Sequence, residues 1–511
     1  MKKVKNMVKK ITALLIVAAM MVGSCMSVTA ATQEVHSNTK GKITINNVQT
    51  NDIVTLIPLV NITYDEEGTN TINYTFASDA VAKLARQAGI ASIDAYKALN
   101  SSSPGFVSFM KAVQNNLATL KTTNDRQMTV AENSTTLEFT EMPMGQYYVW
   151  IQSASGKIYS PITVELIPRT NTDISGTITS ITLDDDQADM SKFTEPTINK
   201  EILVEDKVAA IGSEVHYTVT ISVPKYPDNF TDIVMKLTDN LGAGLVFKEN
   251  SLAIVAEGTL TLTEGGETGD YAVNAYANTR EMQIDFIYDK VKNFTNLTIS
   301  YTAIVTSDIV VGGANKNTAT YTYTVDTDGR ENSKTDEETT TTYALRIQKK
   351  DGELQTRLLE GVEFELLDSK GQVMHFDEVA IKSTELGDKQ GSGYDTRKYV
   401  VNPAGTVTTL VTDEKGFIAI VGLDTGTYTL RETKAKQGYK PIDPIQIEIT
   451  SANVTVKGVR SVEVLNYRES YELPSTGGDG IWFFIGGGIV LMGAAVVMLV
   501  AAKKKGKRNV A

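Results

Sequence analysis

The chain has 511 residues, a formal net charge of −12 and a single cysteine. The first 31 residues carry +5 and the last 35 carry +4, so the segment between them carries −21. Such an acidic segment excludes nucleic acid and anionic lipid surfaces as partners, because like charges repel. At ~100–200 residues per domain it is long enough for two to four domains, each with its own core.

The N-terminus predicts export. Five lysines within the first ten residues precede an apolar run over 11–22, and small residues at 28–31 offer a cleavage site. This order is typical of a secretory signal peptide, to which we assign residues 1–31. A lipoprotein cleavage site ending at Cys25 is an alternative that fits the residues poorly. Because Cys25 is the only cysteine, the exported chain has no thiol and cannot use disulfides for stability.

Residues 32–190 combine strand patterns with a helical insertion. Apolar and polar residues alternate over 41–76 and again over 137–167, with glycine, asparagine and aspartate between the runs. Ser78 is a candidate N-cap for a helix, and apolar residues at helical spacing recur over 106–120, after a break at Pro104-Gly105. We expect an N-terminal β-domain that closes in an acidic run before residue 190.

Two further β-domains are predicted, over 191–341 and 342–470. Strand patterns follow one another from Glu195 to Tyr323 and resume at Tyr343. The stretch 326–342 is charged, rich in threonine and without apolar residues, which predicts a solvated loop and linker. Many short strands at regular spacing favour an all-β fold of tandem immunoglobulin-like sandwiches.

The residues do not predict a metal centre or an enzyme active site. The three histidines, His36, His216 and His375, are isolated from one another and from any thiol. Asp326 and Asp328 begin like a calcium loop, but the later ligand positions do not follow. We therefore expect no metal and no cofactor, and we expect a structural protein rather than a surface enzyme.

The C-terminal segment, 471–511, predicts a membrane anchor. Residues 481–502 are uncharged and apolar or small, and this run is close to the ~20 residues that a helix needs to cross a bilayer. The basic tail that follows stays inside the cell. A pentapeptide precedes the run and lies outside: Leu473, Pro474, Ser475, Thr476 and Gly477. An ordinary tail anchor that follows a Leu-Pro turn is the alternative.

This order resembles the LPxTG cell-wall sorting signal of Gram-positive surface proteins. The resemblance implies that a sortase cleaves between Thr476 and Gly477 and transfers the Thr476 carbonyl to an amine. The membrane helix would then be a transient anchor, and the mature protein would be attached to the cell wall, with peptidoglycan as a covalent partner.

Three polar residues of the third domain continue the apolar faces of strands. Alternate side chains of a strand share one face, so residues in phase with an apolar run are expected on the core side. They are Lys349 after the run 343–347, Glu432 after 428–430 and Asn466 after 462–464. Burying one of them alone would cost several kcal/mol, but together they can satisfy one another.

The second domain repeats this arrangement in the same chain order. Lys200 lies in phase between Ile198 and Ile202, Asp239 follows the run 233–237 in phase, and Asn317 begins the phase of 319–323. Each polar residue, taken alone, could end its strand and turn to water. The recurrence of lysine, acid and asparagine in two domains favours a common buried role.

The chemistry of such a trio is intramolecular amide formation. Burial favours the uncharged forms of lysine and carboxylic acid, and a neutral ε-amine is a nucleophile. The acid can polarise the asparagine carboxamide and transfer protons while ammonia leaves. Fixed proximity supplies most of the rate, since effective molarities of ~10⁵ M or more are reachable. The product is a Lys–Asn isopeptide crosslink, which would replace the missing disulfides.

The residues around these trios carry a more specific resemblance. The third domain resembles a CnaB-type (SpaA-like) pilin domain, including an "E box"-like segment over 428–439 in which Lys436 stands where proline is usual. The second domain resembles the CnaA-like fimbrial isopeptide-forming domain, over 239–245 and 317–319. The first resembles the N-terminal domain of Gram-positive backbone pilins, most clearly over 139–148.

The resemblance implies the pairing and the roles. Lys349 would pair with Asn466 under the catalytic acid Glu432. Lys200 would pair with Asn317 under the catalytic acid Asp239. The chain would then be a sortase-anchored pilin whose partners are the sortase and neighbouring pilin subunits.

One element of shaft pilins is missing. These proteins usually carry a Tyr-Pro-Lys-type motif at the end of the first domain, whose lysine accepts the preceding subunit. Lys192 is the only lysine between Ile178 and Glu195 and is the candidate acceptor, although an ordinary linker lysine is an equal alternative. A shaft, tip or basal subunit therefore remains open, as does a monomeric wall-anchored adhesin that binds a host or dietary ligand.

Overall fold

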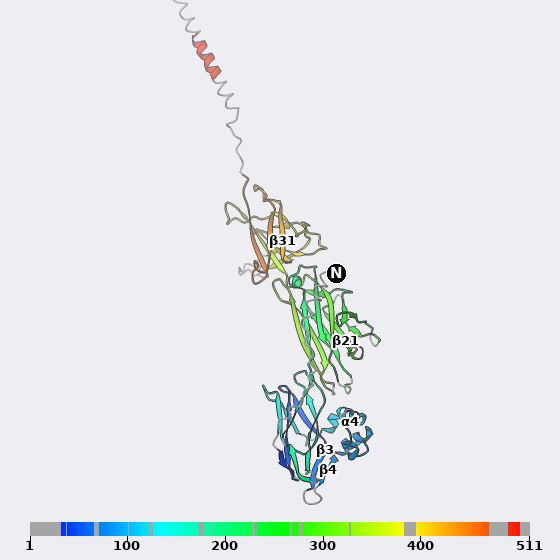
Figure 1. Ribbon diagram of the computed structural model, residues 1–511. Coiled ribbons are helices and arrows are strands. Elements are labelled where there is room, and N and C mark those ends of the chain that lie inside the picture. Colours follow the sequence, from blue (N-terminus) through cyan, green and yellow to red (C-terminus); the bar gives the residue numbers. More distant parts are fainter. Residues whose placement is uncertain are drawn as a thin grey trace, which may run out of the picture.

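Three β-domains follow one another along an elongated molecule (Figure 1). The structure, a computed structural model, describes residues 32–469 and 489–500, apart from residue 37 and short breaks at 66–70, 101, 122–125, 173–177, 185, 227–229, 231, 266–267, 275–278, 327–328 and 383–394. The predicted signal peptide (1–31) and the pentapeptide at 473–477 lie outside the described residues.

Among its described residues, the first domain contains one five-stranded sheet and two three-stranded sheets. One three-stranded sheet has the order β12 (Asp186–Met190), β2 (Lys40–Asn46) and β6 (Thr136–Pro143), with β12 parallel to β2. The five-stranded sheet has the order β4 (Thr71–Phe76), β3 (Ile53–Asp65), β7 (Gly145–Gln152) and β9 (Ile162–Leu166), and β5 (Arg126–Thr129) also pairs with β3. The other three-stranded sheet contains β1 (Thr32–Glu34), β11 (Ile178–Asp184) and β10 (Pro168–Thr172).

The helical insertion lies between β4 and β5 and flanks the sheets (Figure 1). The predicted cap is confirmed, because the Ser78 side chain accepts a hydrogen bond from the Val81 N–H at the start of α2 (Asp79–Gln87). The helix predicted over 106–120 is in fact two helices, which are α4 (Pro104–Gln114) and α5 (Leu117–Leu120). Pro104 begins α4 rather than breaking it, since proline fits the first turn of a helix. A short α3 (Ile93–Lys97) precedes them.

The second domain is a sandwich of two sheets. The first sheet contains β14 (Ile198–Ile202), β15 (Glu214–Ser222), β22 (Asn296–Val305), β18 (Ala253–Ala256) and β19 (Leu260–Thr261), with β17 (Leu245–Phe247) also paired to β22. The second sheet contains β20 (Tyr271–Asn274), β21 (Glu281–Phe286), β16 (Met235–Leu241), β23 (Asn315–Thr324) and β24 (Glu331–Thr340). Two short helices, η1 (Val204–Lys207) and α6 (Tyr288–Val291), connect strands.

The linker predicted over 326–342 was wrong for most of its length. Residues 331–340 form the ten-residue strand β24, which pairs with β23 at the edge of the second sheet. Its residues alternate between exposed and half-buried up to the buried Thr340, and the exposed ones are glutamate, serine or threonine. An edge strand of this composition resists pairing with other chains, so charge here marks an edge rather than a loop.

The third domain is also a two-sheet sandwich. One sheet has the order β27 (Phe376–Lys382), β28 (Asp395–Val401), β30 (Phe417–Leu423), β25 (Tyr343–Asp351) and β33 (Val459–Asn466). The other has the order β29 (Leu410–Val411), β26 (Glu363–Leu367), β31 (Gly426–Lys434) and β32 (Ile445–Ile449). The first and last strands, β25 and β33, are parallel neighbours, and Asp351 lies opposite Asn466 in their register.

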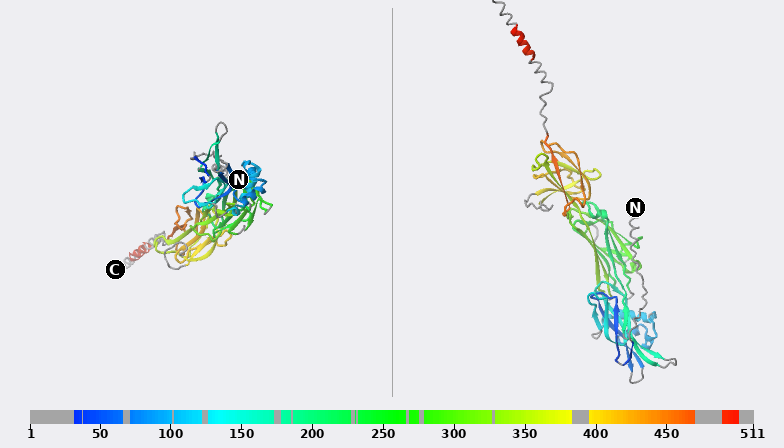
Figure 2. Two further views of the ribbon diagram at one scale, coloured as in Figure 1. Left: turned by 90° about the horizontal axis from the view of Figure 1, so that it is seen from below. Right: turned by 60° about the vertical axis from the view of Figure 1, so that its left-hand side comes forward.

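The three domains follow one another with a junction between each pair (Figure 2). Hydrogen bonds cross both junctions. At the first junction, β13 (Phe193–Thr194) pairs with β8 (Ile158–Tyr159), and the Tyr323 hydroxyl donates to the Gly156 carbonyl at 3.0 Å. At the second, the Ile211 N–H donates to the Gly422 carbonyl at 3.0 Å. The buried apolar residues of the second and third domains form one continuous cluster, which also includes Ile158 of the first domain, whereas the other buried apolar residues of the first domain form a separate core.

The predicted membrane segment is only partly described. Residues 489–500 are helical and exposed, while the rest of 481–502 lies outside the described residues. Within the part that the structure describes, no helix is both long and apolar enough to cross a membrane.

Candidate functional site

The third domain contains a fully buried centre made of Lys349, Glu432 and Asn466. Lys349 lies in β25 and Asn466 ends β33 in the same sheet, while Glu432 comes from β31 in the facing sheet. The side chains of Lys349 and Glu432 are 0% exposed, and Asn466 is buried as well. The alternation of each strand therefore turns these polar groups into the core instead of toward water.

One carboxylate connects the other two members of this centre. The Lys349 Nζ donates to Glu432 Oε2 at 2.9 Å, and the Asn466 Nδ2 donates to Glu432 Oε1 at 2.6 Å. The Lys349 Nζ also donates to Asn466 Oδ1. The amine nitrogen thus lies against the carboxamide that it would attack, and the acid touches both nitrogens.

The surroundings favour a neutral amine. Burial lowers the pKa of Lys349 from its usual value. Desolvation penalises the ammonium form, so the nucleophilic free amine is more accessible here than in water.

The second domain contains a corresponding centre made of Lys200, Asp239 and Asn317. Lys200 lies in β14 of one sheet, whereas Asp239 and Asn317 lie on the adjacent strands β16 and β23 of the other sheet. The Lys200 Nζ donates to Asp239 Oδ2 at 2.5 Å. All three residues are buried.

A fourth residue of this centre, Tyr301, was missed by the sequence analysis. Its hydroxyl accepts from the Lys200 Nζ at 2.6 Å and from the Asn317 Nδ2 at 2.7 Å, and it donates to Asp239 Oδ2 at 2.7 Å. Tyr301 follows Leu297 and Ile299 in phase along β22, so its place on the core face could be read from the sequence. Its role could not, because a core tyrosine is ordinary in a β-sandwich.

Burial shifts the acid and the amine of this centre in opposite directions. Desolvation raises the pKa of Asp239 and lowers the pKa of Lys200, which favours a neutral acid beside a neutral amine. The outer oxygens Asp239 Oδ1 and Asn317 Oδ1 are buried without a hydrogen-bond partner among the described residues. A buried oxygen without a hydrogen bond lowers the stability of the fold, and such atoms are often found where a group has a chemical role.

The first domain shows no comparable centre in its described part. All eight lysines between residues 32 and 194 lie at exposed or half-buried positions. Its buried acid, Asp52, is bonded instead to the Tyr159 hydroxyl at 2.5 Å and to the backbone N–H groups of Gln49, Ala154 and Ser155. Asp52 therefore fixes local loops.

Lys192, the candidate acceptor, is exposed in the short segment between β12 and β13. Its carbonyl accepts a hydrogen bond from the Ser160 N–H at 2.7 Å, which fixes the backbone while the side chain extends to solvent. Lys192 thus lies at the end of the first domain next to the second. The donor pentapeptide at 473–477 is outside the described residues.

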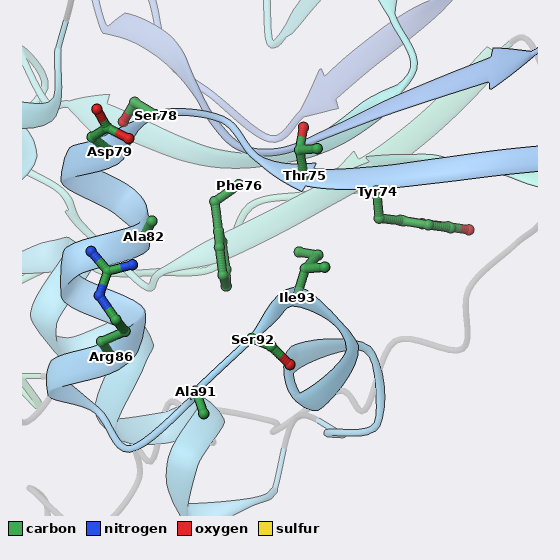
Figure 3. Close-up of a pocket in the computed structure, with 10 residues that line it drawn as sticks. All are labelled: Tyr74, Thr75, Phe76, Ser78, Asp79, Ala82, Arg86, Ala91, Ser92 and Ile93. Atoms are coloured by element: carbon green, nitrogen blue, oxygen red, sulfur yellow. The ribbon is translucent and has the colours of Figure 1, made fainter.

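The helical insertion borders a shallow hollow of about 390 Å³ (Figure 3). Phe76 and Ile93 reach into it, and Arg86 extends from α2 at its side. Two of its polar side chains are already used as helix caps, since Ser78 caps α2 and Ser92 caps α3. The hollow does not collect groups for catalysis.

The histidines are likewise occupied by local contacts. His216 Nδ1 lies 2.9 Å from Asp206 Oδ2, and His375 Nδ1 lies 2.8 Å from the Gly405 carbonyl oxygen. In the described ranges, no three histidine, cysteine or acidic side chains are grouped as metal ligands would be.

Comparison with known proteins identifies the fold of the chain. Residues 343–461 match the SpaA family, described as a prealbumin-like fold domain. The T6 backbone pilin of serotype M6 Streptococcus pyogenes, a modular three-domain structure, superposes with a TM-score of 0.60 at 18% identity over 82% of each chain. The full-length major pilin SpaD from Corynebacterium diphtheriae superposes with a TM-score of 0.52 at 18% identity, over 85% of this chain and 99% of that one.

A sequence relative leads to the same group. The trypsin-resistant surface T6 protein of Streptococcus pyogenes is 24% identical over 280 residues, which are 53% of this chain and 48% of that protein. The chain thus spans about half the length of the curated relative that it matches. Residues 343–461 thus match a SpaA-type domain, and more than four fifths of the chain shares the fold of these two pilins.

Proposed function

We propose that this protein is a wall-anchored pilin subunit whose second and third domains each form one Lys–Asn isopeptide bond. The observation that carries this proposal is the recurrence of a buried lysine, acid and asparagine in two consecutive domains, with each amine hydrogen-bonded to its acid. A single buried ion pair is weak evidence for a function, but two that lie in the same order beside a carboxamide are not explained by stability alone.

The proposed reaction in the third domain uses only groups of the centre. Lys349 gives one proton to Glu432, and the free Nζ attacks the Asn466 carboxamide carbon. The Nζ–Cγ bond forms, the Cγ–Nδ2 bond breaks, and the Nδ2 leaves as ammonia after it receives a proton. Glu432 touches both nitrogens and so can carry protons from one to the other.

Assembly would use the two ends of the chain. A sortase would cleave after Thr476 and join its carbonyl either to a lysine of a neighbouring subunit or to peptidoglycan, which would hold the protein on a Gram-positive cell surface. Lys192 is the proposed acceptor because it is exposed at the end of the first domain. The acidic segment between the two ends, at −21, agrees with a protein that does not bind nucleic acid.

Boiling surface extracts in detergent tests the assembly. A pilin shaft predicts a ladder of covalent multimers that Lys192→Arg abolishes, whereas Lys83→Arg, an exposed lysine of α2, leaves the ladder intact. One band from the unaltered protein would contradict polymerisation and favour a tip or basal subunit, or a singly anchored adhesin for a host or dietary ligand. A ladder that persists in Lys192→Arg would assign the linkage to another lysine.

A further inference from the structure

The two buried centres differ in how the acid reaches the amide. In the third domain, the two oxygens of Glu432 bond the lysine and the asparagine nitrogens directly. In the second domain, Asp239 bonds Lys200 through Oδ2, while its Oδ1 has no partner among the described residues. The Asn317 nitrogen is bonded to the Tyr301 hydroxyl instead. Aspartate is one methylene shorter than glutamate, and the tyrosine hydroxyl fills the gap.

We propose that the Tyr301 hydroxyl is a catalytic proton relay for the Lys200–Asn317 crosslink, in the place that the second carboxylate oxygen takes in the third domain. This inference rests on the proposed function. Its geometric basis is that the Tyr301 hydroxyl contacts the Lys200 Nζ, which loses protons, and the Asn317 Nδ2, which gains one. The same hydroxyl also contacts the acid Asp239.

The protons balance through this oxygen. The Lys200 ammonium first gives a proton to Asp239, and the free amine attacks the Asn317 carboxamide carbon. Tyr301 then gives its proton to Nδ2 and takes the Asp239 proton in return. The attacking Nζ gives its second proton to Asp239 Oδ2, which it already contacts. The Nζ–Cγ bond forms, the Cγ–Nδ2 bond breaks and ammonia leaves. Of the three ammonium protons, one stays on the new amide, one leaves with ammonia and one remains on Asp239.

A purely packing role for Tyr301 would not require these contacts. The ring of Tyr217 stacks on that of Tyr301 with centroids 5.5 Å apart, and the Lys200 Nζ lies 5.2 Å from each centroid. The two rings thus surround the amine equally. Yet the Tyr217 hydroxyl bonds Thr340 at 2.8 Å and lies beside the Asn317 amide, while the Tyr301 hydroxyl bonds the amine and the acid.

Refolding kinetics of the mature chain, residues 32–476, test the relay. Chain recovered unfolded from inclusion bodies is diluted from urea, and the two crosslinked peptides are quantified by mass spectrometry over time. We expect Tyr301→Phe to slow the Lys200–Asn317 bond about 10²-fold or more, as for other lost proton-transfer groups. The Lys349–Asn466 bond in the same molecules should form at the unaltered rate. Tyr321→Phe is the matched control, because it removes another tyrosine hydroxyl of the domain, one that donates to the Ser222 carbonyl at 3.0 Å.

The outcomes separate this inference from the proposed function. If the unaltered chain forms neither bond, the proposed function and the relay are both overturned. If it forms both, and Tyr301→Phe forms the Lys200–Asn317 bond equally fast, only the relay is overturned. Should Tyr301→Phe fail to give a trypsin-resistant domain, 3-fluorotyrosine at this position keeps the shape and the hydroxyl but changes its acidity. A relay then changes the crosslinking rate, and an unchanged rate overturns it.

Discussion

Replacing Glu432 by glutamine removes the acid of the third domain with almost no change in volume, so no cavity is added. We expect the Lys349–Asn466 bond not to form. That bond would close a loop of 117 residues. Without it the unfolded chain has more conformational entropy, which lowers the free energy of unfolding by about 5 kcal/mol by the loop-entropy relation. For a domain of about 130 residues, this lowers the melting temperature by roughly 20 °C.

Calorimetry of the mature chain measures this effect, with Glu463→Gln as the matched control. Glu463 lies on the same strand as Asn466 but is exposed, and it pairs with Lys350 at 2.5 Å on the surface. A surface pair contributes at most about 1 kcal/mol, so the control should melt within a few degrees of the unaltered chain. If Glu432→Gln melts no lower than Glu463→Gln, the idea that a crosslink stabilises this domain is refuted.

Three further outcomes are expected. Hydrogen bonds from the Tyr439 hydroxyl and from the Leu354 N–H hold the pKa of Asp351 at about 2, below its usual 3.8. Because the folded pKa is depressed, this stabilisation is complete above about pH 4 and is lost as pH falls toward 2. Asp351→Asn should therefore flatten the acid-unfolding curve of the third domain in that interval, and an unchanged curve would contradict this. A Cβ on Gly312 would lie 2.2 Å from the Lys457 carbonyl carbon across the junction of the second and third domains. Gly312→Ala should thus increase trypsin cleavage at this junction, whereas Gly258→Ala, also at positive φ but with open space around it, should not. Asp239→Ala should raise the mass of the mature chain by one ammonia, because the Lys200–Asn317 bond does not form and Asn317 keeps its amide nitrogen. If Asn466 also kept its amide nitrogen, the two centres would not be independent.

Alternation along strands made much of the core predictable from the sequence. The runs before Lys349 and after Asn317 are buried as the pattern indicates, because a strand between two sheets must place alternate residues inward. The same alternation identified the six polar residues of the two buried centres, because the neighbouring residues on the same strand face are apolar.

Other features were not readable in this way. Strand β24 was predicted as a loop, because an edge strand buries little and its charges hide the strand pattern. Tyr301 was not predicted as a site residue, because tyrosines are common on core faces and only the structure shows its hydroxyl bonded to three polar groups. The packing of the second and third domains into one apolar cluster depends on residues such as Ile211 that lie outside any strand.

The intact mass of the mature chain tests the central claim most directly. Two self-formed crosslinks predict a mass lower than the sequence mass by two molecules of ammonia. Peptide mapping should then find Lys200 joined to Asn317 and Lys349 joined to Asn466. A mass equal to that of the sequence, with both lysines recovered in linear peptides, would contradict the account.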